Sequence, residues 1–505
     1  MTKSNSFVVC STLFVFSLAL RLLLINKGPY SIDCLNFIQL AEQFLKTRHL
    51  PYHVGFGYPL TIILTAGFIF LGNLFPVPET ALAANFISVL FGSGCVVLLY
   101  LIVGRWFDKR AAFYSAFLFS LCPIFLANSL FNSGHAVSLF FLLLGLYLLQ
   151  NHHQTAKITP LLLSAAAFGC AGATRLQEMV LFFIPLSYFF FYCDPLSPPS
   201  GASFRKKIPF YLLFGAVIFF TALSFHLPYL LYDRPRYFHQ LSEFRSLSII
   251  LFDKIFFEKA LFHNIMYLTQ TLSILGMLIT PVGLALLYKD RPQLFIFFML
   301  WIFIPFLLLI CLYTIHPRHQ IFILPPFIVA QTYALVKLMN IRRFFHHAAF
   351  IIYVIIIILT FGHYFPLFYY RHQHPHAKDY ALWLGQVTEP GAYIISTDYS
   401  AFISRYAKRI PYGRMLKDRY ILKDNELLEY KALLVDHLDK GDHIYITDMG
   451  LYTYDFRKKF SNFMKDNFKL EYTGKAYYDD WHRGYLQTHI FENALYKIKK
   501  KNETY

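Results

Sequence analysis

The chain has few charged residues and few cysteines for its length. Of its 505 residues, 15% are charged, 56% are hydrophobic and 19% are aromatic. A water-soluble domain typically carries about 25% charged residues, so this composition excludes an ordinary cytosolic globular fold. We therefore expect most of the chain to lie in a lipid bilayer.

The 7 cysteines lie mostly in apolar segments and never in a CxxC spacing, so neither a disulfide framework nor a zinc site is implied. Acidic residues are also scarce, with 29 Asp and Glu against 46 Lys and Arg, for a net charge of +17. The basic residues gather in short loops between apolar stretches. Retention of positive loops in the cytoplasm and attraction to anionic lipids explain this pattern without a nucleic-acid partner.

Apolar stretches dominate residues 1–370. A spanning helix needs roughly 17–25 apolar residues, and lipid leaves no water to satisfy an open backbone. The fold class expected is therefore a polytopic α-helical membrane protein. We expect about eleven spans, the first uncleaved, near Phe7–Ile25, Leu82–Val103, Ala111–Asn128, His135–Leu149, Ile158–Ala173, Met179–Cys193, Phe210–Leu231, Asn264–Tyr288, Leu294–Tyr313, Ile321–Met339 and Ala348–Leu367.

One further apolar stretch, Tyr58–Phe75, decides the sidedness of the later loops. If it lies at the outer interface without crossing, the basic loops Gly104–Arg110, Asn151–Lys157 and Asn340–Phe345 all face the cytoplasm, as the positive-inside rule requires. The external loops are then residues 26–81 and 232–263, and the C-terminus is extracytoplasmic. We expect a bacterial-type inner (cell) membrane protein.

Residues 371–505 have shorter apolar runs and more charge, which predicts a small soluble α/β domain. Strands are expected near Tyr393–Thr397, His443–Thr447 and Leu486–Phe491, with a helix over Asp424–Leu438. The basic end YKIKKKNETY is expected to fray.

Ionisable groups at span ends and in loops are the informative ones, because charge inside lipid is costly. Asp33 follows the first span and precedes an amphipathic helix that would hold its carboxylate at the interface; an N-cap role is the plainer alternative. The stretch HVGFGYPL sets a rigid turn that could bring backbone N–H groups and His53 toward a phosphate or sugar, although turn formation alone explains it equally well.

The order of these motifs resembles a known family. Asp33 after the first span, the GYP-L turn with Tyr58, the basic loop GRWFDKR, the SLCP span end, GATRLQE (172–178) and HPRHQIFILPPF (316–327) look like the polyprenyl-linked GT-C glycosyltransferases. Within these the chain is similar to glycosyltransferase family 39, the protein mannosyltransferase and lipid A aminoarabinose transferase group. The resemblance covers roughly Phe7 to Leu367.

The resemblance implies that Asp33 is the catalytic residue and acts as base on the acceptor hydroxyl. A phosphate leaving group needs no general acid, so this one carboxylate suffices for in-line displacement with inversion. Arg175 and Arg318, at outer span ends, would stabilise the leaving phosphate, with snorkelling to lipid headgroups as the alternative. Glu178, one helical turn after Arg175, is expected to pair with it.

The chain departs from the family pattern at four places. Relatives carry an acid directly after the catalytic Asp, an Arg two further on, a Lys before the paired prolines and a second acid after the third span. Here Cys34, Asn36, Gly57 and the segment NSGH ending at His135 stand there. His135 could replace the second acid as a hydrogen-bonding group, or it could simply cap a helix.

These observations predict a membrane glycosyltransferase that moves a sugar from a polyprenyl-phosphate donor to an envelope lipid, glycan or protein. A transporter or flippase of a lipid-linked or anionic substrate is the alternative, although pseudo-symmetric halves and broken mid-membrane helices are not evident. A polysaccharide polymerase or ligase is a weaker one. No cofactor is expected to be required, no residue is assigned as a metal ligand, and dependence on a divalent metal is left open.

Overall fold

The computed structural model describes residues 3–51, 58–75, 77, 79–192, 204–232, 234–235, 238, 254–311, 317–396, 399–413, 424–452, 455, 458–479, 486 and 490–501. The chain forms two compact units. The first contains Met1–Asn26 and Phe37–His372, and the second contains Lys27–Asn36 and Gln373–Tyr505. The short segment after the first span thus groups with the C-terminal part of the chain.

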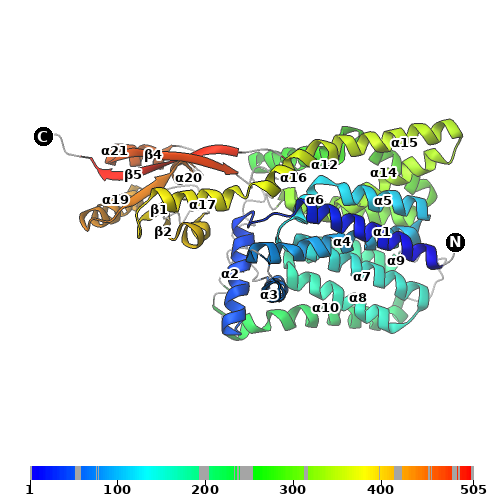
Figure 1. Ribbon diagram of the computed structural model, residues 1–505. Coiled ribbons are helices and arrows are strands. Elements are labelled where there is room, and N and C mark those ends of the chain that lie inside the picture. Colours follow the sequence, from blue (N-terminus) through cyan, green and yellow to red (C-terminus); the bar gives the residue numbers. More distant parts are fainter. Residues whose placement is uncertain are drawn as a thin grey trace. The chain divides into compact units, whose positions relative to one another are not determined.

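The first unit is a bundle of helices (Figure 1). Its elements are α1 (Lys3–Leu24), α2 (Ile32–Thr47, which begins in the second unit), α3 (Pro59–Leu74), α4 (Thr80–Trp106), α5 (Lys109–Leu121), α6 (Pro123–Asn128), α7 (His135–Thr155), α8 (Ile158–Thr174), α9 (Leu176–Tyr192), α10 (Phe204–Tyr232), α12 (Lys254–Asp290), α13 (Pro292–Cys311), the 3-10 helix η2 (Pro317–Phe322), α14 (Leu324–Met339), α15 (Arg343–Ile357), the π-helical turn η3 (Ile358–Gly362) and α16 (His363–Gln373).

The helices confirm the predicted fold class of a polytopic α-helical membrane protein. Within the described residues, 7 helices are long and apolar enough to cross a membrane, and 4 apolar helices are shorter. The longer ones include α4, α7, α10, α12 and α13. The chain is therefore an integral membrane protein.

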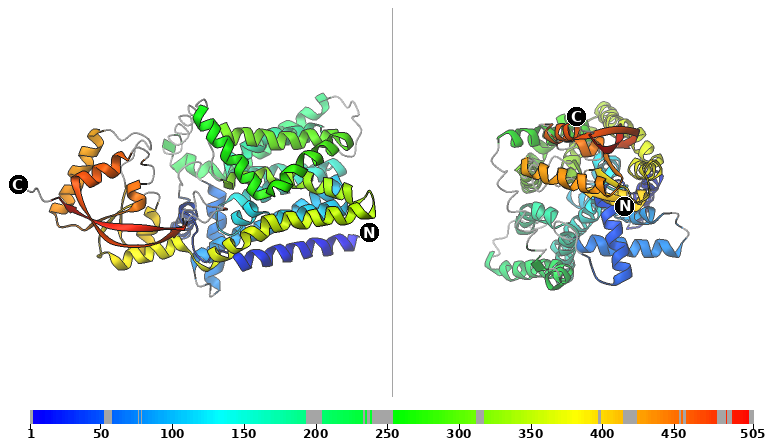
Figure 2. Two further views of the ribbon diagram at one scale, coloured as in Figure 1. Left: turned by 90° about the horizontal axis from the view of Figure 1, so that it is seen from above. Right: turned by 90° about the vertical axis from the view of Figure 1, so that its left-hand side faces the viewer.

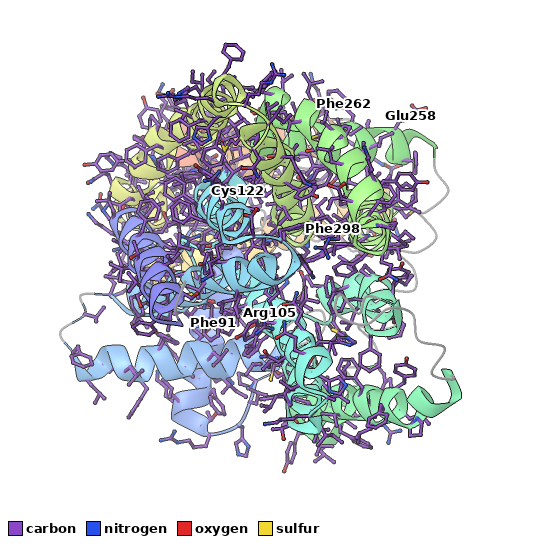
Figure 3. The ribbon with its side chains drawn as sticks, turned by 90° about the vertical axis from the view of Figure 1, so that its right-hand side faces the viewer. Phe91, Arg105, Cys122, Glu258, Phe262 and Phe298 are labelled. Atoms are coloured by element: carbon purple, nitrogen blue, oxygen red, sulfur yellow. The ribbon has the colours of Figure 1, made fainter. Side chains whose placement is uncertain are left out.

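Helix α3 is one of the shorter apolar helices and spans 16 residues. At about 1.5 Å per residue this length falls short of the hydrocarbon thickness. The helix also runs across the direction of α1, α4 and α7 (Figures 1 and 3). Both features favour the prediction that Tyr58–Phe75 lies at the interface, and that placement remains a prediction.

The expected span Ala111–Asn128 is not one continuous helix. It divides into α5 and α6 at Cys122, which has extended backbone angles (φ −61°, ψ 122°). The cause is Pro123, because a proline has no N–H to continue the helix and disfavours helical angles in the residue before it.

Close packing holds the bundle together. Figure 3 shows Cys122 and Phe298 inside the bundle and Phe262 at its rim, and Phe262 is 66% exposed. Small residues let helices approach: a Cβ built on Gly283 of α12 would lie 1.9 Å from the carbonyl oxygen of Ala330 in α14. Small residues at such contacts are characteristic of helix packing in membranes.

The second unit is an α/β domain. It contains α17 (His376–Val387), β1 (Tyr393–Ser396), α18 (Ser400–Phe402), η4 (Ile403–Ala407), β2 (Ile410–Gly413), α19 (Asp424–Asp439), β3 (Ile444–Thr447), α20 (Asp448–Tyr452), α21 (Lys459–Asn467), β4 (Phe468–Asp479) and β5 (Ile490–Lys500). The strand order is β2-β1-β3-β5-β4. Strands β1, β2 and β3 are parallel, and β5 is antiparallel to both β3 and β4.

Helices cover both faces of this sheet. One core contains Tyr380 and Leu384 of α17 and also Leu35 from the start of α2, which is fully buried there. The other contains Leu434 of α19 and Met464 of α21. Consecutive residues Ile394 and Ile395 of β1 point into opposite cores, as the alternation of a strand requires.

The predicted strands over Tyr393–Thr397 and His443–Thr447 correspond to β1 and β3, but the end of the chain was predicted wrongly. The first half of the basic segment expected to fray, Tyr496–Lys500, forms the end of β5, which pairs with β4 in a long twisted ribbon (Figure 2). Leu495 and Ile498 are buried and anchor it, while its lysines reach outward. The strand predicted at Leu486–Phe491 therefore begins late, at Ile490, and continues to Lys500.

Candidate functional site

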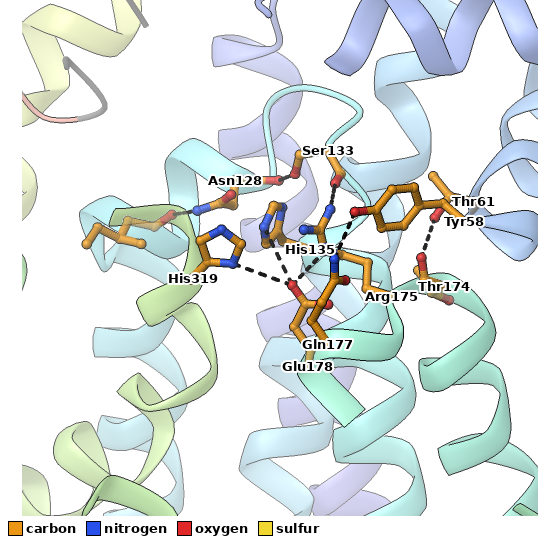
Figure 4. A network of polar contacts seen from close by, with 11 residues as sticks. Tyr58, Thr61, Asn128, Ser133, His135, Thr174, Arg175, Gln177, Glu178 and His319 are labelled. Carbon is orange, nitrogen blue, oxygen red and sulfur yellow. Dashed lines mark hydrogen bonds and ion pairs between the residues drawn. The ribbon is translucent and has the colours of Figure 1, made fainter. Parts of the chain in front are cut away.

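Four segments of the first unit bring polar side chains together inside the bundle (Figure 4). Tyr58 precedes α3, His135 is the first residue of α7, and His319 lies in η2. Arg175 separates α8 from α9, and Glu178 lies in the first turn of α9. Each of these side chains lies at or beside a helix end, so the group forms one cluster at helix termini.

Arg175 and Glu178 form the central ion pair. The Nε of Arg175 donates to Oε1 of Glu178 at 2.6 Å, and its Nη1 donates to the Ser133 carbonyl at 3.3 Å. Their side chains are 6% and 0% exposed. The carboxylate also stands in the first turn of its helix, where the helix dipole favours a negative charge. This pairing was predicted from the three-residue spacing, and the structure confirms it.

Tyr58 orients the arginine from the other side. The guanidinium of Arg175 lies 5.0 Å from the centre of the Tyr58 ring, within range of a cation–π interaction. Gln177 donates a hydrogen bond to the Tyr58 hydroxyl at 3.0 Å. Tyr58 has φ of 50°, which is unfavourable for a bulky residue, and Pro59 follows it directly.

Two histidines face the carboxylate of Glu178. Nε2 of His135 lies 3.8 Å from Oε1 of Glu178, and Nδ1 of His319 lies 3.7 Å from the same oxygen. The two imidazole rings meet edge to face with centroids 5.2 Å apart. Burial lowers the pKa of His319 to about 4; Glu178 opposes this shift, and the charges of Arg318 and Arg175 reinforce it. His319 is therefore neutral at neutral pH.

Hydrogen bonds fix the loop that precedes His135. Asn132 donates two hydrogen bonds. Its backbone N–H donates to Oδ1 of Asn85 at 3.0 Å, and its side-chain amide donates to Oγ1 of Thr65 at 2.8 Å. Gly134 has φ of 75°, and a Cβ there would lie 3.1 Å from Oγ1 of Thr61. Only glycine fits this conformation and space without strain, so the start of α7 is held in one position.

Asp33 belongs to the second unit, and its predicted alternative as an N-cap is wrong. Helix α2 begins at Ile32, and the Ser31 hydroxyl accepts the N–H of Cys34 at 3.2 Å, which is the capping bond. Asp33 occupies the first turn and is half-buried. Because Leu35 is packed in the core of the domain, the start of the helix that carries Asp33 is anchored.

The structure brings Tyr58, His135, Arg175 and Glu178 together as direct neighbours. Arg318 immediately precedes His319 and is half-buried. His53 lies outside the described residues, as does Gly57. His319 was missed, although it stands in the same HPRHQIFILPPF motif as Arg318, because only the arginine suggested phosphate chemistry.

Comparisons with known proteins bear on the family. The family model for dolichyl-phosphate-mannose-protein mannosyltransferase matches residues 69–226, less than half of the chain. The protein named "Putative mannosyltransferase YkcB" of Bacillus subtilis (strain 168) is 29% identical over 140 residues, which are 28% of this chain and 19% of that protein. The chain thus matches less than a fifth of that relative's length. These matches confirm the resemblance drawn from the motifs.

Solved structures of low sequence identity share the fold. ArnT from Cupriavidus metallidurans in the apo state is 13% identical with a TM-score of 0.57, covering 98% of both chains. The oligosaccharyltransferase AglB from Archaeoglobus fulgidus is 13% identical with a TM-score of 0.60, covering 92% of this chain and 73% of that one. The chain therefore shares the fold of these two proteins.

Proposed function

We propose that this protein is a membrane glycosyltransferase that moves a sugar from a polyprenyl-phosphate donor to a cell-envelope acceptor on the external face of the membrane. The family match is to a mannosyltransferase model. AglB was solved with a dolichol-phosphate, and ArnT was solved with undecaprenyl phosphate. Both ligands are the lipid phosphates that such a donor leaves behind, which supports this donor class here.

The buried Arg175 cluster is the observation that carries the proposal. A departing phosphate concentrates negative charge, and cations already oriented in a site of low dielectric stabilise it strongly. Arg175 is held on three sides, by Glu178, the Ser133 carbonyl and the Tyr58 ring. Arg318 adds a second positive charge beside His319. This preorganisation suits a phosphate better than a sugar hydroxyl.

Asp33 is proposed as the base that accepts the proton of the acceptor hydroxyl during in-line displacement. The assignment rests on the family resemblance and on the anchoring of the helix that carries this carboxylate. Of the departures from the family pattern, Cys34 has a physical reason. It is 0% exposed, and a carboxylate at this position would be buried at considerable cost.

The test is sugar transfer in membranes supplied with a radiolabelled polyprenyl-phosphate-sugar pool. General base catalysis contributes about 10²–10⁴-fold, so Asp33→Asn is expected to lose at least ~100-fold in rate while keeping its expression level. Asp436→Asn, an isosteric change at an exposed residue of α19 that pairs only with Lys440 among the described residues, is the matched control.

Equal transfer by wild type and Asp33→Asn would refute the role of Asp33. The same assay separates the transporter alternative. A transporter would move label across the membrane without any covalently glycosylated product.

A further inference from the structure

We propose that His135, Glu178 and His319 bind one divalent transition-metal ion, with zinc as the best fit, in a site that leaves one coordination position open. The potential ligand atoms of these three residues all lie within 4.8 Å of one another. They come from α7, α9 and η2, so the bundle brings together groups that are distant in sequence (Figure 4). The inference does not rest on the proposed function.

Buried polar atoms in this cluster lack hydrogen-bond partners among the described residues. Both ring nitrogens of His135 and Oε2 of Glu178 are in this state, and the two side chains are 1% and 0% exposed. Buried polar groups are normally satisfied, and an exception requires a reason. A metal ion would supply the missing partner for an imidazole nitrogen and for the carboxylate.

The distances are close to those of an occupied site. Zinc bonds of about 2.0–2.1 Å in a tetrahedron place neighbouring ligand atoms roughly 3.3 Å apart. The carboxylate oxygen of Glu178 lies 3.8 Å from Nε2 of His135 and 3.7 Å from Nδ1 of His319. Because all three ligand atoms lie within 4.8 Å of one another, rotamer movements that shorten these separations by about 0.5–1.5 Å would complete the coordination. The His319 side chain is 17% exposed, which provides an entry path.

The ligand set selects the class of ion. Calcium and magnesium prefer all-oxygen ligands, whereas two imidazoles and one carboxylate suit zinc and its first-row neighbours. Three protein ligands leave the fourth tetrahedral position open. Since Arg175 already adds positive charge beside the site, an anionic oxygen is the expected fourth ligand.

The positive charge of Arg175 is compatible with a metal ion because Arg175 hydrogen-bonds to the carboxylate of Glu178, one of the metal ligands. Arg175 donates to Oε1 of Glu178, the oxygen that both histidines face, and a carboxylate oxygen that accepts one hydrogen bond keeps a second lone pair for a metal ion. Metal-binding carboxylates are usually held by such outer hydrogen bonds. The alternative is a metal-free cluster joined only by hydrogen bonds. The sequence predicts that activity requires no cofactor. Binding of a metal ion is a different property, so that prediction is tested separately.

The test uses the purified full-length chain in detergent, stripped with a chelator and titrated with Co²⁺ or Zn²⁺ alone. We expect one ion per chain, visible absorption typical of four-coordinate Co²⁺, and X-ray absorption that shows two imidazole ligands. His135→Ala and His319→Ala should each weaken binding about 100-fold or more, since even outer-shell losses cost 10–100-fold. His263→Ala is the control, because the His263 ring contacts the Lys259 carbonyl within its own helix α12 at the surface. This variant should bind the metal ion as tightly as wild type does.

Three outcomes overturn the proposal: no stoichiometric ion in the wild type, a bound ion without imidazole ligands, or unchanged binding in both cluster variants. The X-ray absorption is measured on the wild type, so a variant that fails to fold does not prevent a decision. The readout is binding without any donor, so it is independent of the transfer assay.

Discussion

Removing Arg175 tests how the buried ion pair is balanced. Arg175→Ala would leave the Glu178 carboxylate, which is fully buried, without its ion-pair partner. Removing one partner of a buried pair typically costs about 3–5 kcal/mol, because an uncompensated charge remains. The lost cation–π contact with Tyr58 adds about 0.5–1 kcal/mol. We therefore expect a loss of about 3.5–6 kcal/mol in the free energy of unfolding.

Glu178→Gln is expected to cost less, because the glutamine oxygen can still accept the Arg175 hydrogen bond and the arginine keeps the Ser133 carbonyl. In the double variant the carboxylate is absent when the guanidinium is removed. The double variant should therefore be more stable than Arg175→Ala alone, and the coupling should reach the upper part of the 0.5–3 kcal/mol range found for residues in contact.

The assay is unfolding of the full chain by SDS in mixed micelles, followed by tryptophan fluorescence. Trp301 reports on the same bundle, since its indole N–H donates to the Phe322 carbonyl at the end of η2 at 2.7 Å. A chelator is present throughout so that no metal contributes to stability. Strict additivity of the two changes, or an Arg175→Ala variant as stable as wild type, would refute the reasoning.

Two other predictions use the same unfolding measurements. Gly283→Ala should destabilise the bundle by at least ~1–3 kcal/mol, because its Cβ would lie 1.9 Å from the Ala330 carbonyl oxygen. Gly67→Ala, whose Cβ would have nothing within 4 Å, should leave stability unchanged or raise it by up to ~1 kcal/mol. Equal effects of the two substitutions would contradict the packing argument. In the soluble domain, burial raises the pKa of Glu389, but hydrogen bonds from Lys497 and Tyr445 outweigh it and lower the pKa from 4.5 to about 2. The stabilisation by ionised Glu389 is therefore present above about pH 4.5 and lost as the pH falls toward 2. It amounts to at most ~1 kcal/mol, because the side chain is 38% exposed. The thermal midpoint of Glu389→Gln should fall less over this pH range than that of wild type, and parallel curves would refute the assignment.

Local pattern predicted most of the membrane unit and little of its site. Apolar runs of fixed length locate spans, because burial in lipid acts on each segment separately. The Arg175–Glu178 pair was also predictable from its three-residue spacing, although Arg175 has extended backbone angles and separates α8 from α9. His135 and His319 meet through packing of distant segments, and no local period encodes that contact.

The soluble domain shows the same limit. Strands β1 and β3 are continuous apolar runs and were found, whereas β5 looks like a charged tail. Its register against β4 pairs residues such as Tyr472 with Tyr496, and only this partner makes the basic segment a strand. Side-chain propensity for strands depends on such cross-strand neighbours.

The Arg175 cluster is poorly explained as a device for stability. A buried ion pair often contributes no more than well-packed apolar side chains of similar volume. Here the pair is accompanied by two neutral imidazoles, and the described residues leave buried nitrogens of His135 and one oxygen of Glu178 without partners. A bundle selected only for stability would fill this space with apolar groups. Arg175 is held rigidly while neighbouring atoms remain unsatisfied, and this combination is expected where a ligand completes the interactions. This supports the proposal that the cluster is a preorganised binding site, which a phosphate, a metal ion, or both would satisfy.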